Sequence, residues 1–210
     1  MVNTGDIRNI VLLGHGGSGK TSLAEAILHK TGATNRLGSV DDRTSICDYY
    51  DEEKQHQHSI ASAIVHAQHA GKLINIIDTP GYPDFIGPAI KAIPAAETAV
   101  IVISAAAGIE TNTRKLFELA TEAGMPFVFV VNKIDAENID LPELIKSIRE
   151  TFDSQCRCAN LPAADNASVI DCVENEAGNS PLADVAKAHT ELLESAIEAD
   201  DELMESYLAS

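Results

Sequence analysis

A glycine-rich octapeptide near the N-terminus constrains the fold more than any other stretch. GHGGSGKT, residues 14–21, stands between an apolar run, Ile7 to Leu13, and the segment SLAEAILHKTG, whose apolar residues recur at helical spacing before a Thr-Gly stop. Such a loop lets backbone amides converge on an anion at a helix N-terminus. The stretch therefore predicts a phosphate-binding loop at a strand–helix junction.

The loop also carries side chains suited to a nucleotide triphosphate. Lys20 is placed to reach the β and γ phosphates, and the Thr21 hydroxyl can ligate Mg²⁺. The candidate nucleotide-binding residues in this stretch are Gly14, His15, Gly16, Gly17, Ser18, Gly19, Lys20, Thr21 and Ser22.

Four apolar runs predict the sheet, namely Ile7 to Leu13, Leu73 to Ile77, Val100 to Ile103 and Phe127 to Val131. They are continuous rather than alternating, which is typical of strands covered on both faces. With helix-like segments between them, they predict an α/β fold with a mostly parallel sheet. Ala70-Gly71-Lys72 separates two extended runs as a hairpin turn would, so we expect one antiparallel edge strand.

A change of composition suggests a second part of the chain. A chain of 210 residues with 45% hydrophobic residues can bury one substantial core with an appendage. We expect the core over residues 1–161 and the beginning of another subdomain over 162–210. There we expect a short strand within NASVIDCVENEAGNS, a helix opening at Ser180-Pro181, and a last short helix after Asp200.

The charge balance limits the possible partners. With 15 basic and 32 acidic residues, a formal charge of −17 repels phosphate backbones and argues against general nucleic-acid binding by this chain. The N-terminus lacks the pattern of a signal peptide, and no apolar stretch approaches the roughly 18 residues of a membrane span. We therefore expect a cytoplasmic protein without a membrane partner.

The stretch LINIIDTPG predicts a second part of the phosphate site. The apolar strand brings Asp78 to the carboxyl edge of the sheet, where a carboxylate can hold the magnesium shell. The backbone amide of Gly81 can then sense a γ-phosphate.

The tetrapeptide Asn132-Lys133-Ile134-Asp135, which follows the strand FVFVV, selects the base. The Asp135 carboxylate can accept hydrogen bonds from the N1–H and the 2-amino group of guanine, and adenine offers no such pair of donors. Asn132 and the stem of Lys133 brace the loop and cover the base. We therefore expect GTP or GDP as the ligand, and an unrelated ATPase is disfavoured.

Together, GHGGSGKTS, INIIDTPGYPDF, VVNKID and DDELMESYL resemble the translational GTPases, and among them elongation factor G and its paralogues. The resemblance covers essentially the whole chain. It implies a P-loop GTPase fold with the start of an inserted subdomain, a Mg²⁺ cofactor, and a guanine nucleotide and the ribosome as partners. It also implies that the chain is the first part of a multidomain, ribosome-dependent GTPase.

Three departures from the family pattern bear on the chemistry. Ser59 stands where the family has the switch-one threonine that ligates magnesium, and its hydroxyl can still coordinate. Tyr82 replaces the histidine that orients the attacking water in the family. The last guanine loop of the family, a Ser-Ala pair, does not occur before Ser210. The resemblance thus implies Lys20, Gly81 and Tyr82 as catalytic residues and Thr21, Ser59 and Asp78 as metal ligands.

The segment from Gly32 to Gln57 is polar and too long for a passive connection. Because it offers little apolar surface to bury, we expect a switch that Ser59 orders through magnesium when a γ-phosphate is present.

Two functions follow. The first is a ribosome-activated GTPase domain that hydrolyses GTP slowly in isolation. The alternative is a regulatory module that signals by GTP occupancy and scarcely hydrolyses, since the neutral phenol of Tyr82 cannot become the cation that a histidine can.

Overall fold

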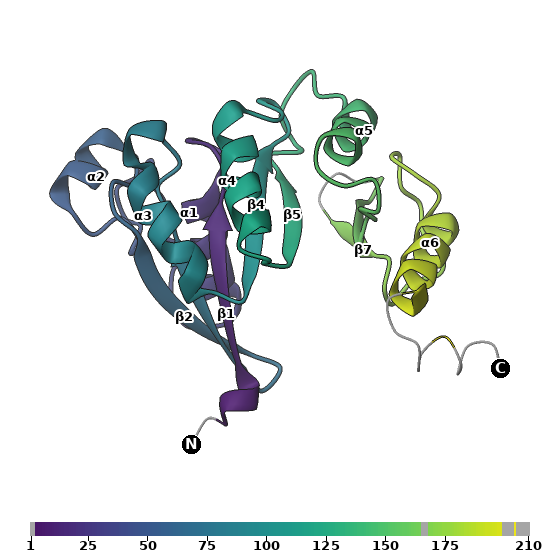
Figure 1. Ribbon diagram of the computed structural model, residues 1–210, viewed down its shortest axis with the longest axis horizontal. Coiled ribbons are helices and arrows are strands. Elements are labelled where there is room, and N and C mark those ends of the chain that lie inside the picture. Colours follow the sequence, from purple (N-terminus) through teal and green to yellow (C-terminus); the bar gives the residue numbers. More distant parts are fainter. Residues whose placement is uncertain (1–2, 165–167, 199–203, 205–210) are drawn as a thin grey trace. The chain divides into compact units, whose positions relative to one another are not determined.

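A five-stranded sheet organises the computed structural model, which describes residues 3–164 and 168–198 together with Met204 (Figure 1). The strand order is β2-β3-β1-β4-β5, and only β2 runs antiparallel to its neighbour. The strands are β1 (Ile7–Leu13), β2 (Ala63–His69), β3 (Lys72–Asp78), β4 (Thr98–Ser104) and β5 (Phe127–Asn132). This confirms the predicted α/β fold with a mostly parallel sheet and one antiparallel edge strand.

The hairpin between β2 and β3 turns through two residues of positive φ, Ala70 at 47° and Gly71 at 75°. Two consecutive residues of this kind match the right-handed twist of antiparallel strands, and glycine adopts the conformation at little cost. The predicted hairpin is therefore confirmed at the predicted place.

Strand register brings the predicted loops to one edge of the sheet. Leu12 of β1 pairs with Asp78 of β3, and Ser104 of β4 pairs with Asn132 of β5. Because these strands are parallel, their carboxyl ends coincide, and the loops that follow them meet at the edge where open α/β sheets bind ligands.

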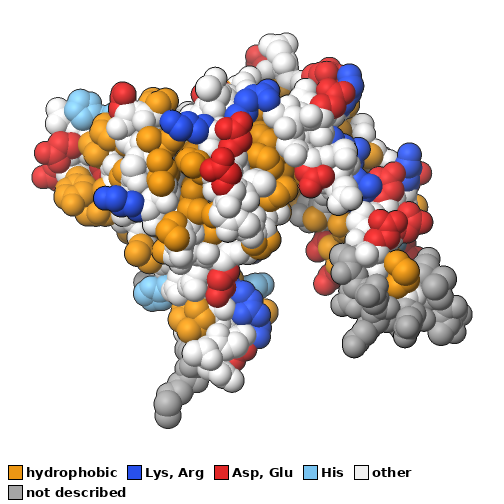
Figure 2. Space-filling model, viewed as in Figure 1, with side chains coloured by type: hydrophobic (Ala, Val, Ile, Leu, Met, Phe, Trp, Pro, Cys, Tyr) orange, Lys and Arg blue, Asp and Glu red, His pale blue; other side chains and the backbone are white. Residues whose placement is uncertain are grey.

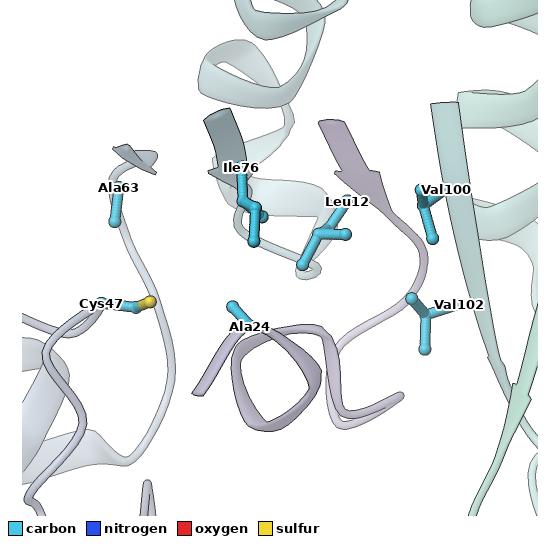
Figure 3. Packing of buried hydrophobic residues seen from close by; sticks show 7 residues of the cluster. All are labelled: Leu12, Ala24, Cys47, Ala63, Ile76, Val100 and Val102. Atoms are coloured by element: carbon cyan, nitrogen blue, oxygen red, sulfur yellow. The ribbon is translucent and has the colours of Figure 1, made fainter. Parts of the chain in front are cut away.

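Helices cover both faces of the sheet. On one face, Ala24 of α1 (Lys20–Lys30) belongs to a cluster whose seven buried residues are shown in Figure 3: Leu12, Ala24, Cys47, Ala63, Ile76, Val100 and Val102. The alternate positions, including Val11 and Ile101, are fully buried on the other face, where α4 (Thr111–Glu122) contacts β1 and β4. This double cover explains why the strands are continuously apolar. The remaining elements of this part are η1 (Thr4–Asp6), α2 (Asp51–His56), η2 (Pro83–Phe85), α3 (Ile86–Ala92) and η3 (Ile93–Ala95).

A buried carboxylate of α1 holds the middle of the polar segment between α1 and β2. The Glu25 side chain is 1% exposed, and its Oε1 accepts hydrogen bonds from the Ser45 hydroxyl at 2.8 Å and from the Ile46 amide at 2.6 Å. The Cys47 amide donates to the same oxygen at 3.3 Å. The segment is thus ordered by hydrogen bonds to a buried acceptor rather than by apolar burial alone.

A second buried carboxylate, Glu53 of α2, holds the end of the segment. Its Oε1 accepts from the amides of Ile60 at 2.8 Å and Ala61 at 3.0 Å, and its Oε2 accepts from the Tyr50 amide at 3.0 Å. The latter bond belongs to a capping box at the start of α2. Helix α2 and the chain leading into β2 are therefore fixed to each other.

The chain divides into two compact units, Met1–Ile139 and Asp140–Ser210. The predicted boundary between residues 161 and 162 lies later, because composition changes there whereas packing changes at residue 140. Helix α5 (Leu141–Thr151) and strand β6 (Asn160–Pro162) consequently fall in the second unit. The assignment of 1–161 as core and 162–210 as insert stays a prediction.

The second unit has its own small core. Strand β6 pairs antiparallel with β7 (Val169–Asp171), and Leu161, Cys172 and Val185 are buried together. The expected helix start at Ser180-Pro181 is wrong, since α6 spans Val185–Glu198. The Asp184 carboxylate accepts the Ala186 amide at 2.9 Å as a helix cap, whereas Ser180 Oγ accepts the Leu182 amide at 3.2 Å within a turn.

The helix expected after Asp200 lies outside the described residues. Met204 is the one described residue in that stretch. Among the residues that are described, none of the helices combines the length and the apolar character needed to cross a membrane.

Replacing Glu25 with alanine is predicted to loosen residues 45–47 selectively. The change removes the acceptor of the Ile46 amide and one of the two acceptors of the Cys47 amide, which also donates to Ser45 Oγ. We expect amide hydrogen exchange at these positions to accelerate at least tenfold, equivalent to about 1.4 kcal/mol of local stability. His29→Ala, at the exposed end of the same helix, serves as the control and should leave this exchange unchanged. Unaltered protection in Glu25→Ala would show that apolar packing alone orders the segment.

Candidate functional site

The glycine-rich loop joins β1 to α1 in conformations that favour glycine. Gly17 and Gly19 have φ values of 78° and 97°, and Gly19 is the N-cap of α1. A Cβ at Gly19 would collide with the side-chain amide of Asn132, and one at Gly14 would collide with the backbone oxygen of Val102. The loop is therefore pressed against the ends of β4 and β5.

The Lys20 side chain lies inside this loop. It is 5% exposed, and its Nζ donates to the carbonyl oxygens of Gly14 at 2.9 Å and His15 at 2.8 Å. Burial lowers the pKa of Lys20 to about 8, while the nearby Asp78 carboxylate opposes that shift. Phosphate oxygens would offer this amine a charged acceptor, which binds more strongly than a neutral carbonyl.

The positive charge of the site is local. On the face shown in Figure 2, Lys and Arg side chains are scattered among acidic and neutral ones and form no continuous stripe. In a chain of formal charge −17, an anion bound at the loop depends on Lys20 and the loop amides.

The side-chain oxygens of the three predicted metal ligands lie close together. Thr21 Oγ1 donates to Asp78 Oδ2 at 2.6 Å and lies 3.3 Å from Ser59 Oγ. Ser59 Oγ in turn donates to Asp48 Oδ1 at 2.8 Å. Asp48 is 2% exposed, and the sequence analysis missed it because it belongs to no motif in the polar segment.

The side-chain oxygens of these four residues form a donor set that fits Mg²⁺. The Asp78 carboxyl is buried, burial raises its pKa to about 6, and its Oδ1 has no hydrogen-bond partner within the described residues. Burial also raises the pKa of Asp48. Buried carboxylates without full partners are costly, and hard oxygen donors are what Mg²⁺ prefers. Thr21, Ser59, Asp78 and Asp48 are thus the residues able to hold the ion.

A cavity of about 260 Å³ opens beside these oxygens, between the glycine-rich loop and the polar segment. The predicted site residues that line it are Gly16, Gly17, Gly19, Lys20, Thr21, Ser22, Ser59, Gly81, Tyr82 and Lys133. The predicted residues outside the lining are Gly14, His15, Ser18, Asp78, Asn132 and Asp135. Asp48 and His58, which no motif had singled out, also line the cavity.

His15 turns away from the cavity toward α4. Its side chain is 2% exposed, with Nδ1 3.2 Å from the Thr113 hydroxyl and Nε2 3.9 Å from a carboxylate oxygen of Glu110. Burial lowers the pKa of His15, although Glu110 opposes the shift. The imidazole therefore ties the loop to α4, and only the backbone of His15 remains available to a phosphate.

The tetrapeptide predicted to select the base, residues 132–135, is hydrogen-bonded to the glycine-rich loop. Asn132 Nδ2 donates to the carbonyl oxygen of Ser18 at 3.0 Å, and Lys133 has a φ of 58° as the chain leaves β5. Asp135 lies exposed in the turn that follows. Its recognition of guanine stays a prediction.

Gly81 lies close to Lys20 and is held from α4. Asn112 Nδ2 donates to the Gly81 carbonyl oxygen at 2.8 Å, and a Cβ on Gly81 would collide with Lys20 Nζ and the His15 carbonyl. Only glycine fits this close approach. Asn112 is thus a second contributor that the sequence analysis missed, since no local pattern marks it.

The Tyr82 ring lies across the phosphate loop. A Cβ on Gly16 would lie 2.8 Å from the ring, and the ring centroid is 5.0 Å from that of His58. Tyr82 remains 45% exposed. The phenol therefore forms part of the cavity wall between Gly16 and His58.

Comparison with known proteins agrees with this arrangement. The family model described as the elongation factor Tu GTP binding domain matches residues 5–206. An elongation factor G-like protein of Mycobacterium tuberculosis (strain ATCC 25618 / H37Rv) is 32% identical over 97% of this chain and 30% of its own length. Tetracycline resistance protein TetO of Campylobacter jejuni is also 32% identical, with the same two coverages, 97% and 30%.

A crystal structure of a protein from Thermus thermophilus superposes with a TM-score of 0.84 at 32% identity, covering 97% of this chain and 33% of that one. The chain thus spans about 30% of the length of the curated relatives it matches. These matches confirm the resemblance to translational GTPases that the motifs indicated. The chain belongs to the elongation factor Tu GTP-binding domain family.

Proposed function

We propose that this chain is the guanine-nucleotide switch domain of an elongation factor G-like protein, and that it hydrolyses GTP in the cytoplasm when the intact protein is on the ribosome. The observation that supports this most strongly is the Thr21 hydroxyl, which donates to Asp78 and lies 3.3 Å from the Ser59 hydroxyl, beside the buried Lys20. It supports the proposal because oxygens suited to a metal ion and an amine suited to a phosphate lie at the same edge of the sheet.

Each residue has a defined task in this proposal. Lys20 and the loop amides hold the β and γ phosphates, and the Gly81 amide, positioned by Asn112, donates to the γ-phosphate. Thr21, Ser59, Asp78 and Asp48 would hold Mg²⁺, which would neutralise negative charge on the phosphates. Asp135 selects guanine, with Lys133 covering the base.

The alternative is a module that signals by GTP occupancy with little hydrolysis, and the specific observation in its favour is Tyr82 at the cavity wall. Turnover by the full-length protein with and without ribosomes separates the two. We expect strong stimulation by ribosomes, and Lys20→Ala should abolish it because the phosphate contact is lost. Lys30→Ala, exposed at the end of α1, is the matched control and should retain full activity. Tight GTP binding without turnover on ribosomes would instead establish the occupancy module.

The base preference should change with Asp135. In Asp135→Asn the side-chain amide can donate to the C2 carbonyl of xanthine but no longer accepts both guanine donors. We expect GTP affinity to fall at least tenfold, equivalent to about 1.4 kcal/mol, and XTP affinity to rise. Competition binding with GTP, XTP and ATP measures both changes. The guanine assignment is wrong if GTP binding is unaltered and XTP gains nothing.

The segment 32–57 should respond to the γ-phosphate through Ser59. Amide exchange in this segment is expected to be slower with a non-hydrolysable GTP analogue than with GDP, since the Ser59 hydroxyl would hold the metal ion in the triphosphate state and not in the diphosphate state. Ser59→Ala should remove the difference, whereas Ser59→Thr should keep it. Equal exchange in the two nucleotide states of the wild type would contradict the switch.

A further inference from the structure

The proposed hydrolysis requires a group that can accept a hydrogen bond from the attacking water, and this inference rests on that proposed function. Lys20 and the Gly81 amide are donors only. The hydroxyls of Thr21 and Ser59 donate to the carboxylates of Asp78 and Asp48, and their oxygens are the proposed metal ligands. The position therefore calls for a further acceptor at the cavity.

His58 lies at the cavity in a position suited to this task. It lines the cavity together with Gly81 and Tyr82, directly before Ser59 in the chain. Its ring centroid lies 5.0 Å from that of Tyr82 and 6.0 Å from that of Phe85, with which it is stacked at 28°. Aromatic contacts on two sides restrict the orientation of the imidazole.

A backbone contact selects the tautomer of His58. Its Nδ1 lies 3.1 Å from the carbonyl oxygen of His56. Because a carbonyl oxygen only accepts, Nδ1 carries the hydrogen and donates it, and in the neutral ring Nε2 then has a lone pair. The ring therefore presents an acceptor, which the amine and the amides of the site cannot do.

Three other acidic or imidazole side chains near the site are committed elsewhere or poorly suited. The His15 imidazole contacts Thr113 and approaches Glu110 on the side of α4. Both oxygens of Glu53 accept backbone amides. Asp41 lines the cavity, but a carboxylate repels a triphosphate. Among the described lining residues, His58 is the imidazole with a free acceptor nitrogen.

We propose that His58 is the water-positioning residue of this site and that Tyr82 is the wall against which its ring is held. Nε2 accepts a hydrogen bond from the water and directs the oxygen lone pair at the γ-phosphorus. The new P–O bond forms as the bond from the γ-phosphorus to the bridging oxygen breaks. That electron pair leaves with GDP, both water hydrogens finish on inorganic phosphate, and His58 is unchanged.

The test measures single-turnover GTP hydrolysis by the full-length protein on ribosomes, and GTP affinity separately with a fluorescent nucleotide. His58→Ala should lower the rate on the order of 10²- to 10⁴-fold, the usual loss for such a group, while affinity stays within about threefold. His58→Gln, whose side-chain carbonyl also accepts, should recover at least tenfold of that loss. His66→Ala, an exposed histidine on β2, is the matched control and should leave the rate unchanged.

A double variant that moves the imidazole to another position distinguishes a water-positioning role of His58 from a structural role. In the double variant His58→Ala, Tyr82→His, an imidazole returns from the opposite side of the same contact, and the rate should rise at least tenfold over His58→Ala. A parallel fall of rate and affinity in both Ala and Gln variants would assign His58 a structural part and overturn the inference.

Two further outcomes also decide. If His58→Ala hydrolyses like the wild type while Tyr82→Phe loses tenfold or more, the phenol holds the water and His58 does not. If the wild type hydrolyses no GTP on ribosomes, the proposed function and this inference fail together, whereas wild-type activity with an unaffected His58→Ala overturns the inference alone.

Discussion

The short hydrogen bond from Thr21 to Asp78 is the contact on which the site depends. It joins the first turn of α1 to the end of β3 at 2.6 Å, and it exists because Leu12 and Asp78 are paired neighbours in parallel strands. A one-residue slip of β3 would turn Asp78 to the opposite face of the sheet. The apolar core beneath, with Leu12 and Ile76 fully buried, prevents that slip. Core packing and the position of the proposed metal ligands are thus linked through strand register.

The sequence predicted those features that depend on local pattern. Continuous apolar runs marked the strands, and the Ala70-Gly71 turn marked the hairpin, because backbone geometry there demands particular residues. The glycine-rich loop was recognisable for the same reason. In the second unit, proline chemistry suggested a helix start at Ser180, but the Asp184 cap decides the actual start.

The features that sequence analysis missed arise from contacts between distant segments. Asp48 matters because a serine eleven residues later donates to it, and Asn112 matters because it reaches Gly81 across 31 positions. His58 belongs to no motif that the sequence analysis recognised. Its neighbours Tyr82 and Phe85 come from the far side of the β2–β3 hairpin, so only the folded chain brings them together.

Helix α1 makes contacts with two different loops through residues of the same helix. Lys20 and Thr21 begin the helix at the phosphate loop, and Glu25 follows about 7 Å further along its axis, given a rise of about 1.5 Å per residue. Glu25 accepts hydrogen bonds from the Ser45 hydroxyl and the Ile46 amide. A tilt of α1 that moves Lys20 away from the proposed phosphate position also displaces the loop that carries Asp48. The glycine-rich loop and the loop with Asp48 are therefore mechanically coupled through the helix.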